Sequence, residues 1–156
     1  MTTIDSISVS EAMSPVEFTV SQWEKLDGVA QMFQQRGINS APVVDEFGKC
    51  VGIITSGDLV RFQSELAEID ARINHGLSFE VTQSPASGSL EIVEHPFDEV
   101  KRQMTSCLQT IDQSSSILLA SKIMCDQNIH HLIVLDQSQR PVGILSSLDI
   151  LAKLNR

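Results

Sequence analysis

The sequence predicts an α+β fold built from two copies of one β-α-β-β-α unit. Three observations predict it: an internal repeat, pairs of short β-runs joined by hairpin-length loops, and amphipathic helical stripes beside those runs. The chain has 156 residues, of which 42% are hydrophobic and 20% are charged, so it can bury an ordinary core. Length alone allows one or two domains. The repeat indicates two small units that need each other for a core, and hence one module.

The repeat is clearest over residues 38–58, which align with residues 129–149. Eight of these 21 positions are identical, whereas about one in fifteen would match by chance. The alignment continues upstream without a gap and pairs Met13 with Met104 at the same offset of 91 residues. This ungapped register indicates an internal duplication.

Each copy is expected to open with a short extended segment, 18–20 in the first copy and 109–111 in the second, followed by a helix. In the first copy Ser21 is expected to cap this helix, with Glu24 completing a capping box, and Gly37 is expected to end it. In the first helix, apolar residues recur at helical spacing, at Leu26, Val29, Ala30 and Phe33. The matching positions of the second helix are Ile117, Ala120, Ser121 and Met124.

Two short β-runs follow each helix. They span 41–45 and 50–55 in the first copy, and 132–136 and 142–146 in the second. The loops between the runs have four or five residues, which is typical of a hairpin.

A closing helix is expected to begin near Asp58 in the first copy and near Asp149 in the second. The first closing helix is expected to extend to about residue 74. Its counterpart in the second copy is expected to be shorter, because it has only the eight residues 149–156.

The copies define the predicted organisation of the chain. Residues 7–75 form the first unit and residues 97–156 the second. The linker, 76–96, contains the stretch TQSPASGS, whose turn-forming residues predict a mobile loop.

Charge narrows the range of partners. The formal net charge is −9, from 11 Lys and Arg against 20 Asp and Glu. This balance argues against general nucleic-acid binding and against adhesion to an anionic membrane. Any phosphate must therefore be held by local geometry. No apolar run approaches the roughly twenty residues that cross a bilayer, and the N-terminal residues lack the pattern of a signal peptide.

Cysteine and histidine positions offer little chemistry. Cys50, Cys107 and Cys125 are odd in number and have no CxxC spacing, which fits neither a disulfide framework nor a zinc site. A reduced, cytoplasmic protein is expected. The four histidines lack carboxylate partners at metal-ligand spacing, and Cys125 is expected on a helix packed against its own hairpin. The sequence therefore predicts no catalytic residue, no metal and no cofactor.

The best-matched element of the two copies is a strand-to-helix passage of the form G-h-h-[ST]-x-x-D, where h is apolar. In a purely structural interpretation, Thr55 or Ser146 is the N-cap of a helix, and Asp58 or Asp149 is its third residue. In a functional interpretation, a hydroxyl and free amides at a helix N-terminus hold an anion, and the carboxylate accepts two hydrogen bonds from a ribose diol. Both interpretations can hold together.

The duplicated unit, its hairpin and this motif resemble the cystathionine-β-synthase (CBS) domain, which occurs in tandem pairs called Bateman modules. The resemblance covers about residues 7–75 and 97–156. It implies two β-α-β-β-α CBS repeats packed as a pseudo-twofold pair, with two clefts between the sheets. In that family the clefts commonly bind adenine nucleotides or S-adenosylmethionine, and two pairs often associate into a flat disc. A homodimer of four repeats is therefore expected, either parallel or antiparallel.

The resemblance also implies roles for individual residues. By motif position, Asp58 and Asp149 resemble the ribose-binding aspartates. The residues that resemble phosphate-side hydroxyls are Thr55, Ser56, Ser146 and Ser147. The residues that resemble those surrounding the base are Thr19, Val20, Ala41, Pro42, Thr110 and Ile111.

A histidine pair, His130 and His131, precedes a strand of the second copy where several nucleotide-binding members carry a basic pair that touches phosphate. Asn39 and Ser40 take that place in the first copy. Ordinary surface histidines are the alternative. If the pair contacts phosphate, nucleotide affinity rises as the pH falls toward 6, because the imidazoles gain positive charge.

The two copies depart from the family pattern unequally. The first has Pro42 and Thr55, where the second has Ile133 and Ser146. Both aspartates are present, so neither cleft is excluded. One cleft is expected to be occupied more readily than the other, and the sequence does not show which.

The predicted function is that of a stand-alone regulatory module. It would bind an adenosine-containing ligand (AMP, ADP, ATP or S-adenosylmethionine) in one or both clefts and signal to a regulated protein partner by a conformational change. The alternative is a ligand-free structural, dimerisation and interaction module. The charge of −9 favours that alternative, because a negatively charged chain repels polyphosphates.

Overall fold

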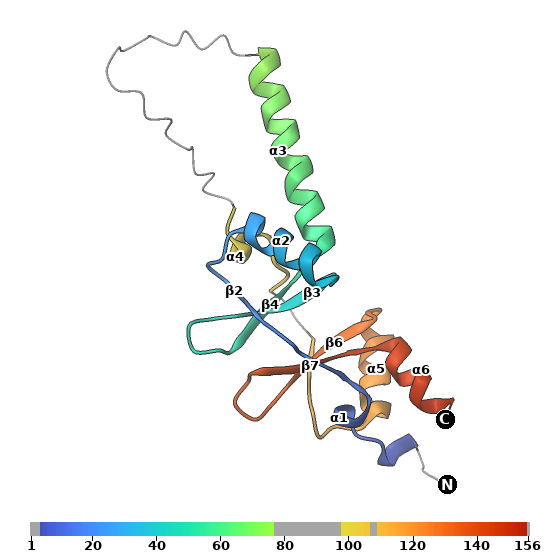
Figure 1. Ribbon diagram of the computed structural model, residues 1–156. Helices are drawn as coiled ribbons and strands as arrows, with labels where there is room; N and C mark the ends of the chain where they lie inside the picture. Colours follow the sequence, from blue (N-terminus) through green and yellow to red (C-terminus); the bar gives the residue numbers. More distant parts are fainter. Residues whose placement is uncertain (1–3, 77–97, 107–108, 156) are drawn as a thin grey trace.

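The structure is a computed structural model that describes residues 4–76, 98–106 and 109–155. Its helices and strands alternate in two similar series along the chain (Figure 1). In chain order they are η1 (Ile4–Ser6), α1 (Val9–Ala12), β1 (Ser14–Pro15), β2 (Val20–Ser21), α2 (Leu26–Arg36), β3 (Ser40–Val44), β4 (Cys50–Thr55), α3 (Ser56–Gly76), α4 (Val100–Gln103), β5 (Thr110–Asp112), α5 (Ile117–Gln127), β6 (His131–Leu135), β7 (Pro141–Ser146) and α6 (Ser147–Leu154).

Each repeat contributes one small sheet, as the sequence predicts. In the first, β2 pairs in parallel with β3, and β3 forms an antiparallel hairpin with β4. In the second, β5 pairs in parallel with β6, and β6 forms the hairpin with β7. Both hairpins shift register at matching points, between Val43 and Val44 and between Val134 and Leu135. The predicted α+β fold of two repeats is therefore confirmed.

The segments that precede the two repeats are exchanged between them. Strand β1, from the start of the chain, adds to the second sheet, where Ser14 lies opposite Ile144. At the matching place in the first sheet, Ile53 forms an antiparallel bridge with Thr105. This exchange joins the repeats about a pseudo-twofold relation and makes each sheet depend on both halves of the chain.

Hydrogen bonds follow the same exchange at the same offset. The amide of Leu26 donates to the carbonyl of Asp98 (2.8 Å), and the amide of Ile117 donates to the carbonyl of Ile7 (3.0 Å). Each bond therefore ties the start of one repeat's helix to the segment that precedes the other repeat.

The two hydrophobic cores are composite for the same reason. Val9 and Ala12 of α1 pack in the core of the second repeat, among Ile117, Leu132 and Leu145. Val100 of α4 packs in the core of the first repeat, whose members also include Val20, Leu26, Val29, Phe33, Ala41, Val43, Ile54, Leu59 and Phe62.

The first helix of repeat 1 begins later than the sequence predicts. Helix α2 starts at Leu26, so the expected capping box at Ser21 and Glu24 is wrong. The Ser21 hydroxyl instead accepts a hydrogen bond from the amide of Trp23 (3.3 Å) in a turn. After this turn Lys25 is extended, and it forms a β-bridge with Glu99.

The ends of the paired helices agree better with the sequence. Gly37 ends α2 in the left-handed conformation (φ 65°), as predicted, and glycine adopts this conformation at little cost. In repeat 2, Ser116 caps α5 and accepts a hydrogen bond from the amide of Leu119 (3.2 Å). Ser116 matches Lys25 of repeat 1, and its β-bridge with Ser8 matches the bridge between Lys25 and Glu99. Both copies therefore have the bridge, and Ser116 adds a side-chain cap that Lys25 does not.

The closing helices differ greatly in length. Helix α3 has 21 residues and α6 has eight, and α3 projects beyond its sheet (Figure 1). The predicted linker, 76–96, falls on residues outside the described part of the chain, apart from Gly76 at the end of α3.

Candidate functional site

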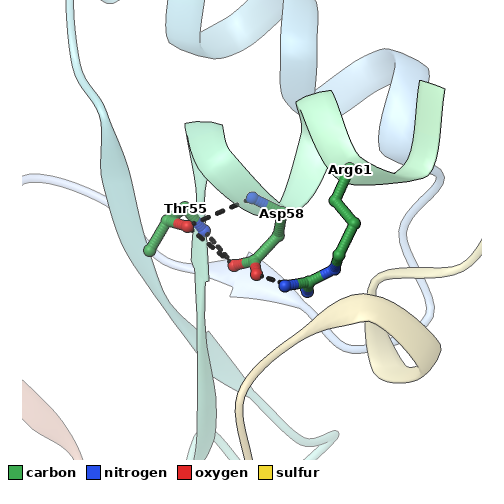
Figure 2. Close-up of polar contacts among 3 residues, drawn as sticks. All are labelled: Thr55, Asp58 and Arg61. Carbon is green, nitrogen blue, oxygen red and sulfur yellow. Dashed lines mark hydrogen bonds and ion pairs between the residues drawn. The ribbon is translucent and has the colours of Figure 1, made fainter. Parts of the chain in front are cut away.

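The two strand-to-helix passages form almost identical hydrogen-bond clusters. In repeat 1 the amide and the hydroxyl of Thr55 both donate to Oδ2 of Asp58 (2.8 Å each), and the Asp58 amide donates to the Thr55 hydroxyl (3.3 Å) (Figure 2). In repeat 2 the amide and the hydroxyl of Ser146 donate to Oδ2 of Asp149 (2.8 and 2.7 Å), and the Asp149 amide donates back (3.1 Å). The predicted helix-capping role of both motifs is confirmed.

These clusters use much of the hydrogen-bonding capacity that a bound anion would need. The amide of Ser56 donates to the carbonyl of Asn39 (2.8 Å), and the amide of Ser147 donates to the carbonyl of His130 (3.0 Å). The first and third amides of each closing helix therefore already have partners. An anion at either helix start would rely on the serine hydroxyls and on nearby cations more than on free amides.

The aspartates differ in what contacts their second oxygen. Oδ1 of Asp58 accepts a charge-assisted hydrogen bond from the Arg61 guanidinium (2.7 Å), one turn along α3 (Figure 2). The residue of repeat 2 that matches Arg61 is Ala152. Within the described part of the chain, Oδ1 of Asp149 has no hydrogen-bond or ion-pair partner. The Asp149 carboxylate therefore keeps one oxygen for a ligand, and the Asp58 carboxylate does not.

A cavity of about 380 Å³ lies where the two repeats meet. This inter-repeat cavity is lined by residues of β1, of the segment after it, of the end of α2, of β3 and of β7: Pro15, Val16, Glu17, Phe18, Arg36, Ile38, Ser40, Pro42 and Ile144. Its volume falls in the range of about 300–1,000 Å³ that is typical of small-molecule pockets.

Ile144 connects this cavity to the open aspartate. It precedes Ser146 by two residues on β7, so the two side chains lie on the same face of the strand. Ser146 is in turn the cap that holds Asp149. A ligand against Ile144 would lie on the same face of β7 as Ser146. Neither Ser146 nor Asp149 is part of the cavity lining, and Ser40 of that lining pairs with Thr55, the cap of Asp58.

The lining combines an aromatic ring with charged groups. The Arg36 guanidinium lies 4.9 Å from the centroid of the Phe18 ring, which is cation–π distance. Glu17 adds a carboxylate to the same lining. Rings and apolar walls suit a planar heteroaromatic group, and Arg36 supplies positive charge beside them.

The six residues expected to surround the base lie in three environments: the cavity lining, the buried cores and the exposed surface. Pro42 lines the cavity. Val20 and Ala41 are buried in the core of repeat 1, and Ile111 is buried in the core of repeat 2. Thr19 and Thr110 are exposed, and Thr19 is not part of the cavity lining.

The histidines lie at the start of α6. His131 begins β6 and pairs across the hairpin with Ser146, and the carbonyl of His130 holds the amide of Ser147. Both imidazoles are exposed. The structure thus gathers His130, His131, Ser146, Ser147 and Asp149 around one helix start.

The sequence did not identify several residues of the cavity. Phe18, Arg36, Ile38, Ser40 and Ile144 line it, and none was assigned a ligand-binding role. Ile144 follows the motif glycine directly, and Ile38 matches Ile129 in the repeat, so both carried a signal. Arg36 matches Gln127, and nothing in the repeat marks it.

Other candidate chemistry is limited. Among the residues that the structure describes, no group of three His, Cys, Asp or Glu side chains could hold a metal ion, and no helix is long and apolar enough to cross a membrane. Burial raises the pKa of the Cys50 thiol, which lowers its thiolate fraction and its nucleophilicity. Cys125 is exposed on α5, and Cys107 lies outside the described residues.

The exchanged segments, the paired hairpins and the two capped aspartates define a tandem pair of CBS domains. The CBS domain family matches this chain twice, at residues 8–65 and 98–156. The chain belongs to this family, and the family resemblance inferred from its motifs is confirmed.

Several relatives share the whole pair. The chain is 32% identical over 129 residues to the uncharacterized protein MJ1404 of Methanocaldococcus jannaschii, covering 83% of this chain but 24% of that protein. The structure resembles CBSX2 in complex with AMP (17% identity, TM-score 0.66, covering 96% and 99% of the two chains). It also resembles the CBS domain pair of MJ0100 in complex with 5′-methylthioadenosine and S-adenosyl-L-methionine (23% identity, TM-score 0.66, covering 96% and 99%). At these identities, the two likenesses establish the fold.

Proposed function

We propose that this chain is a regulatory module that binds an adenosine-containing ligand in the inter-repeat cavity, with Asp149 accepting hydrogen bonds from the ribose. The observation that carries the proposal is the contrast between the two aspartates. Arg61 occupies Oδ1 of Asp58, whereas Oδ1 of Asp149 is open within the described residues. A vicinal diol can donate two hydrogen bonds, and the two lone pairs of this open oxygen can accept both.

The inter-repeat cavity supports the other parts of such a ligand. Phe18, Ile38 and Pro42 provide apolar contacts for a base. Arg36 supplies positive charge at the cavity, and His130 and His131 are basic side chains at the start of α6. In a chain of net charge −9, these local cations offset the repulsion of a phosphate.

The candidate ligands are AMP, ADP, ATP and S-adenosylmethionine. The AMP complex of CBSX2 and the complex of MJ0100 support this chemical class. In the other cleft, Thr55 and Ser56 would take the place of Ser146 and Ser147. The Arg61–Asp58 pair occupies an oxygen of Asp58, so this cleft is expected to bind the ligand more weakly. One ligand per chain is therefore expected.

Signalling would follow from the position of the cavity between the repeats. A ligand that contacts both β3 and β7 can bind more tightly to one relative placement of the repeats than to another. It then shifts the equilibrium between the placements by the difference in its binding free energies. The proposed module has no catalytic activity and no cofactor, acts as a homodimer and reports to a protein partner. Its free Cys50 and Cys125 suit a reducing compartment such as the cytoplasm.

Isothermal titration with AMP, ADP, ATP and S-adenosylmethionine tests the proposal. Asp149→Asn is expected to weaken binding at least tenfold, because a hydrogen bond to a charged group contributes about 1.5–3 kcal/mol. Asp58→Asn is the matched control and should leave the affinity within about threefold of the unmodified chain. Repeating the titrations with AMP at pH 6 and pH 8 should show tighter binding at pH 6, and His130→Ala should reduce that difference.

Two results would contradict the proposal. Equal losses in Asp149→Asn and Asp58→Asn would remove the distinction between the clefts. The absence of binding by every adenosine compound would favour the alternative, a ligand-free interaction module. The exposed leucines of α5 and α6 are the observation that supports this alternative.

A further inference from the structure

One exposed surface of repeat 1 differs in its side chains from the matching surface of repeat 2. Trp23, in the turn after β2, is 52% exposed, and Phe47, in the loop of the β3–β4 hairpin, is 72% exposed. The Nζ atom of Lys101, on α4, lies 4.5 Å from the centroid of the Trp23 ring, which is cation–π distance. We call Trp23, Phe47 and Lys101 the aromatic patch.

Hydrogen bonds hold the three parts of the aromatic patch close together. The side-chain amide of Gln22 donates to Oε2 of Glu46 (3.4 Å). Trp23 directly follows Gln22, and Phe47 directly follows Glu46, so this bond joins the neighbours of the two aromatic residues. The backbone amide of Lys101 donates to the carbonyl of Gln22 (2.9 Å), which brings α4 beside the same turn.

Repeat 2 has a matching backbone contact at this place. The amide of Ser10 donates to the carbonyl of Gln113 (3.0 Å), and both residues are 91 positions away from the matching pair, Lys101 and Gln22. The side chains, however, are different. The residues that match the aromatic patch are all exposed serines: Ser10, Ser114 and Ser138. Because the shared backbone forms without rings or a lysine here, the aromatic patch is not needed to fold the repeat, and exposed rings of this kind mark interaction sites.

The exposed charges of this surface that have no partner are positive. Lys49 follows Phe47 by two residues in the same hairpin loop. Arg140, from the hairpin of repeat 2, lies against that loop, since a Cβ atom on Gly48 would be 3.8 Å from its Nε atom. Within residues 4–76, 98–106 and 109–155, neither of these cations nor Lys101 forms an ion pair.

The carboxylates near the aromatic patch are less available than these cations. Three of them already have hydrogen-bond or ion-pair partners: Asp45, Glu46 and Asp98. Two others are half-buried: Glu24 and Glu99. The surface therefore presents aromatic rings beside free positive charges, although the whole chain has a net charge of −9. Its complement is an apolar side chain beside a carboxylate.

We propose that the aromatic patch docks a segment of a partner protein in which an apolar or aromatic side chain lies beside an aspartate or a glutamate. The apolar side chain packs on Trp23 and Phe47. The carboxylate pairs with Lys49, Lys101 or Arg140. This inference extends the proposed function by giving the surface that a partner protein contacts, and docking does not depend on adenosine binding.

The position of the surface suits a partner that senses how the repeats are placed. Trp23 and Phe47 belong to repeat 1, whereas Lys101 lies on the segment that precedes repeat 2, and Arg140 lies in the hairpin of repeat 2. A docked segment therefore contacts both halves of the chain. In Figure 1 the β3–β4 hairpin points to the left of the view, away from α5 and α6, so the surface stays clear of those helices.

Selection from a phage-displayed library of random peptides tests the chemistry of the partner. The unmodified full chain is the bait, and a variant that combines Trp23→Ser, Phe47→Ser and Lys101→Ser removes peptides that bind elsewhere. Each substitution introduces the serine that repeat 2 has at the matching exposed position, and circular dichroism checks that the fold is kept. The selected peptides are expected to combine acidic residues with aromatic or leucine residues.

Titration with one selected peptide, made synthetically, measures the contribution of each side chain. The fluorescence of Trp23, the single tryptophan, reports binding from within the patch. Phe47→Ser and Lys101→Ser are each expected to weaken binding at least about tenfold. Lys122→Ser is the matched control, because it removes an exposed lysine from α5, and it should leave the affinity unchanged.

Several results would overturn the proposal. These are a selection that enriches no peptide, a selection that enriches basic peptides, and equal affinity in the unmodified chain and Lys101→Ser. A lower mass by light scattering in Phe47→Ser than in the unmodified chain would also overturn it, since a second copy of this chain would then cover the patch. None of these results bears on adenosine binding, which the calorimetric titrations measure separately.

Discussion

At the level of single residues, one side chain distinguishes the two strand-to-helix motifs. Arg61 is 57% exposed, yet it holds an aspartate whose side chain is only 8% exposed. An ion pair with one solvent-exposed partner adds little to stability. Its larger consequence is occupancy, because the guanidinium takes the oxygen that a ribose would need. Ala152 leaves the same oxygen open in repeat 2.

Exchanging this side chain between the repeats should therefore exchange their binding properties. Ala152→Arg places a guanidinium three residues after Asp149, as Arg61 lies after Asp58, and is expected to weaken AMP binding at least tenfold by competing for Oδ1. Because residue 152 is exposed, the free energy of unfolding should change by less than about 1 kcal/mol. Titration calorimetry and denaturant unfolding measure the two effects.

Arg61→Ala is the reciprocal variant. It is expected to raise the number of AMP molecules bound per chain, since it frees Oδ1 of Asp58. If Ala152→Arg bound AMP as tightly as the unmodified chain, the aspartate contrast would not control occupancy.

At the level of elements, the two motif glycines, Gly52 and Gly143, lie where another segment of the chain crosses their strands. A Cβ atom on Gly52 would lie 2.6 Å from Sδ of Met104 and 2.9 Å from the carbonyl oxygen of Thr105. A Cβ atom on Gly143 would overlap Sδ of Met13. Both glycines therefore lie where the exchanged segments pass over β4 and β7. The glycine of the motif allows close packing, whereas its aspartate caps the helix.

Gly52→Ala is accordingly expected to destabilise the protein by about 1–3 kcal/mol through overpacking. The backbone oxygen of Thr105 cannot rotate away as a methionine side chain can, so the strand or the crossing segment must shift. Gly28→Ala is the matched control: it lies in α2 with no atom within 4 Å of its added Cβ, and should stabilise by up to about 1 kcal/mol. Denaturant unfolding compares them, and equal effects would refute the crossing argument.

The elements also show how far the sequence leads. Local signals predicted the hairpins, the C-cap at Gly37 and the capping aspartates, because each depends on a few neighbouring residues. The Ser21 cap failed because the chain turns at residues 22–24 and a distant residue, Glu99, pairs with Lys25, so α2 begins only at Leu26. Arg36 was missed because its role depends on Phe18, which the fold, not the helix pattern, brings beside it.

The site illustrates the same limit. The repeat predicted that the two clefts differ, from Pro42 and Thr55 against Ile133 and Ser146. In the structure the difference that matters lies at Arg61, one turn beyond the motif. The contact that a side chain makes at this position depends on its rotamer, which the sequence does not give. The sequence therefore could not show which aspartate has an open oxygen.

At the level of the whole molecule, the exchange of segments binds the two repeats into one cooperative body. The core of each repeat is completed by a short helix from the other half of the chain, by Val9 for repeat 2 and by Val100 for repeat 1. Neither core is complete without the exchanged segment. The two halves therefore cannot unfold separately without exposing each other's apolar side chains.

Val9→Ala tests this cooperativity, because it damages the core of repeat 2 from the start of the chain. Val9 is fully buried, and its truncation is expected to cost about 2 kcal/mol.

The chain's single tryptophan, Trp23, lies in the other repeat, where Lys101 Nζ is 4.5 Å from its ring. Its fluorescence should report the same lowered midpoint as far-ultraviolet circular dichroism, at one protein concentration, because the repeats unfold together. Ile69→Ala, at a side chain 48% exposed on α3, should leave both midpoints nearly unchanged. A Trp23 midpoint that did not move in Val9→Ala, while the dichroism midpoint fell, would show that the repeats unfold independently.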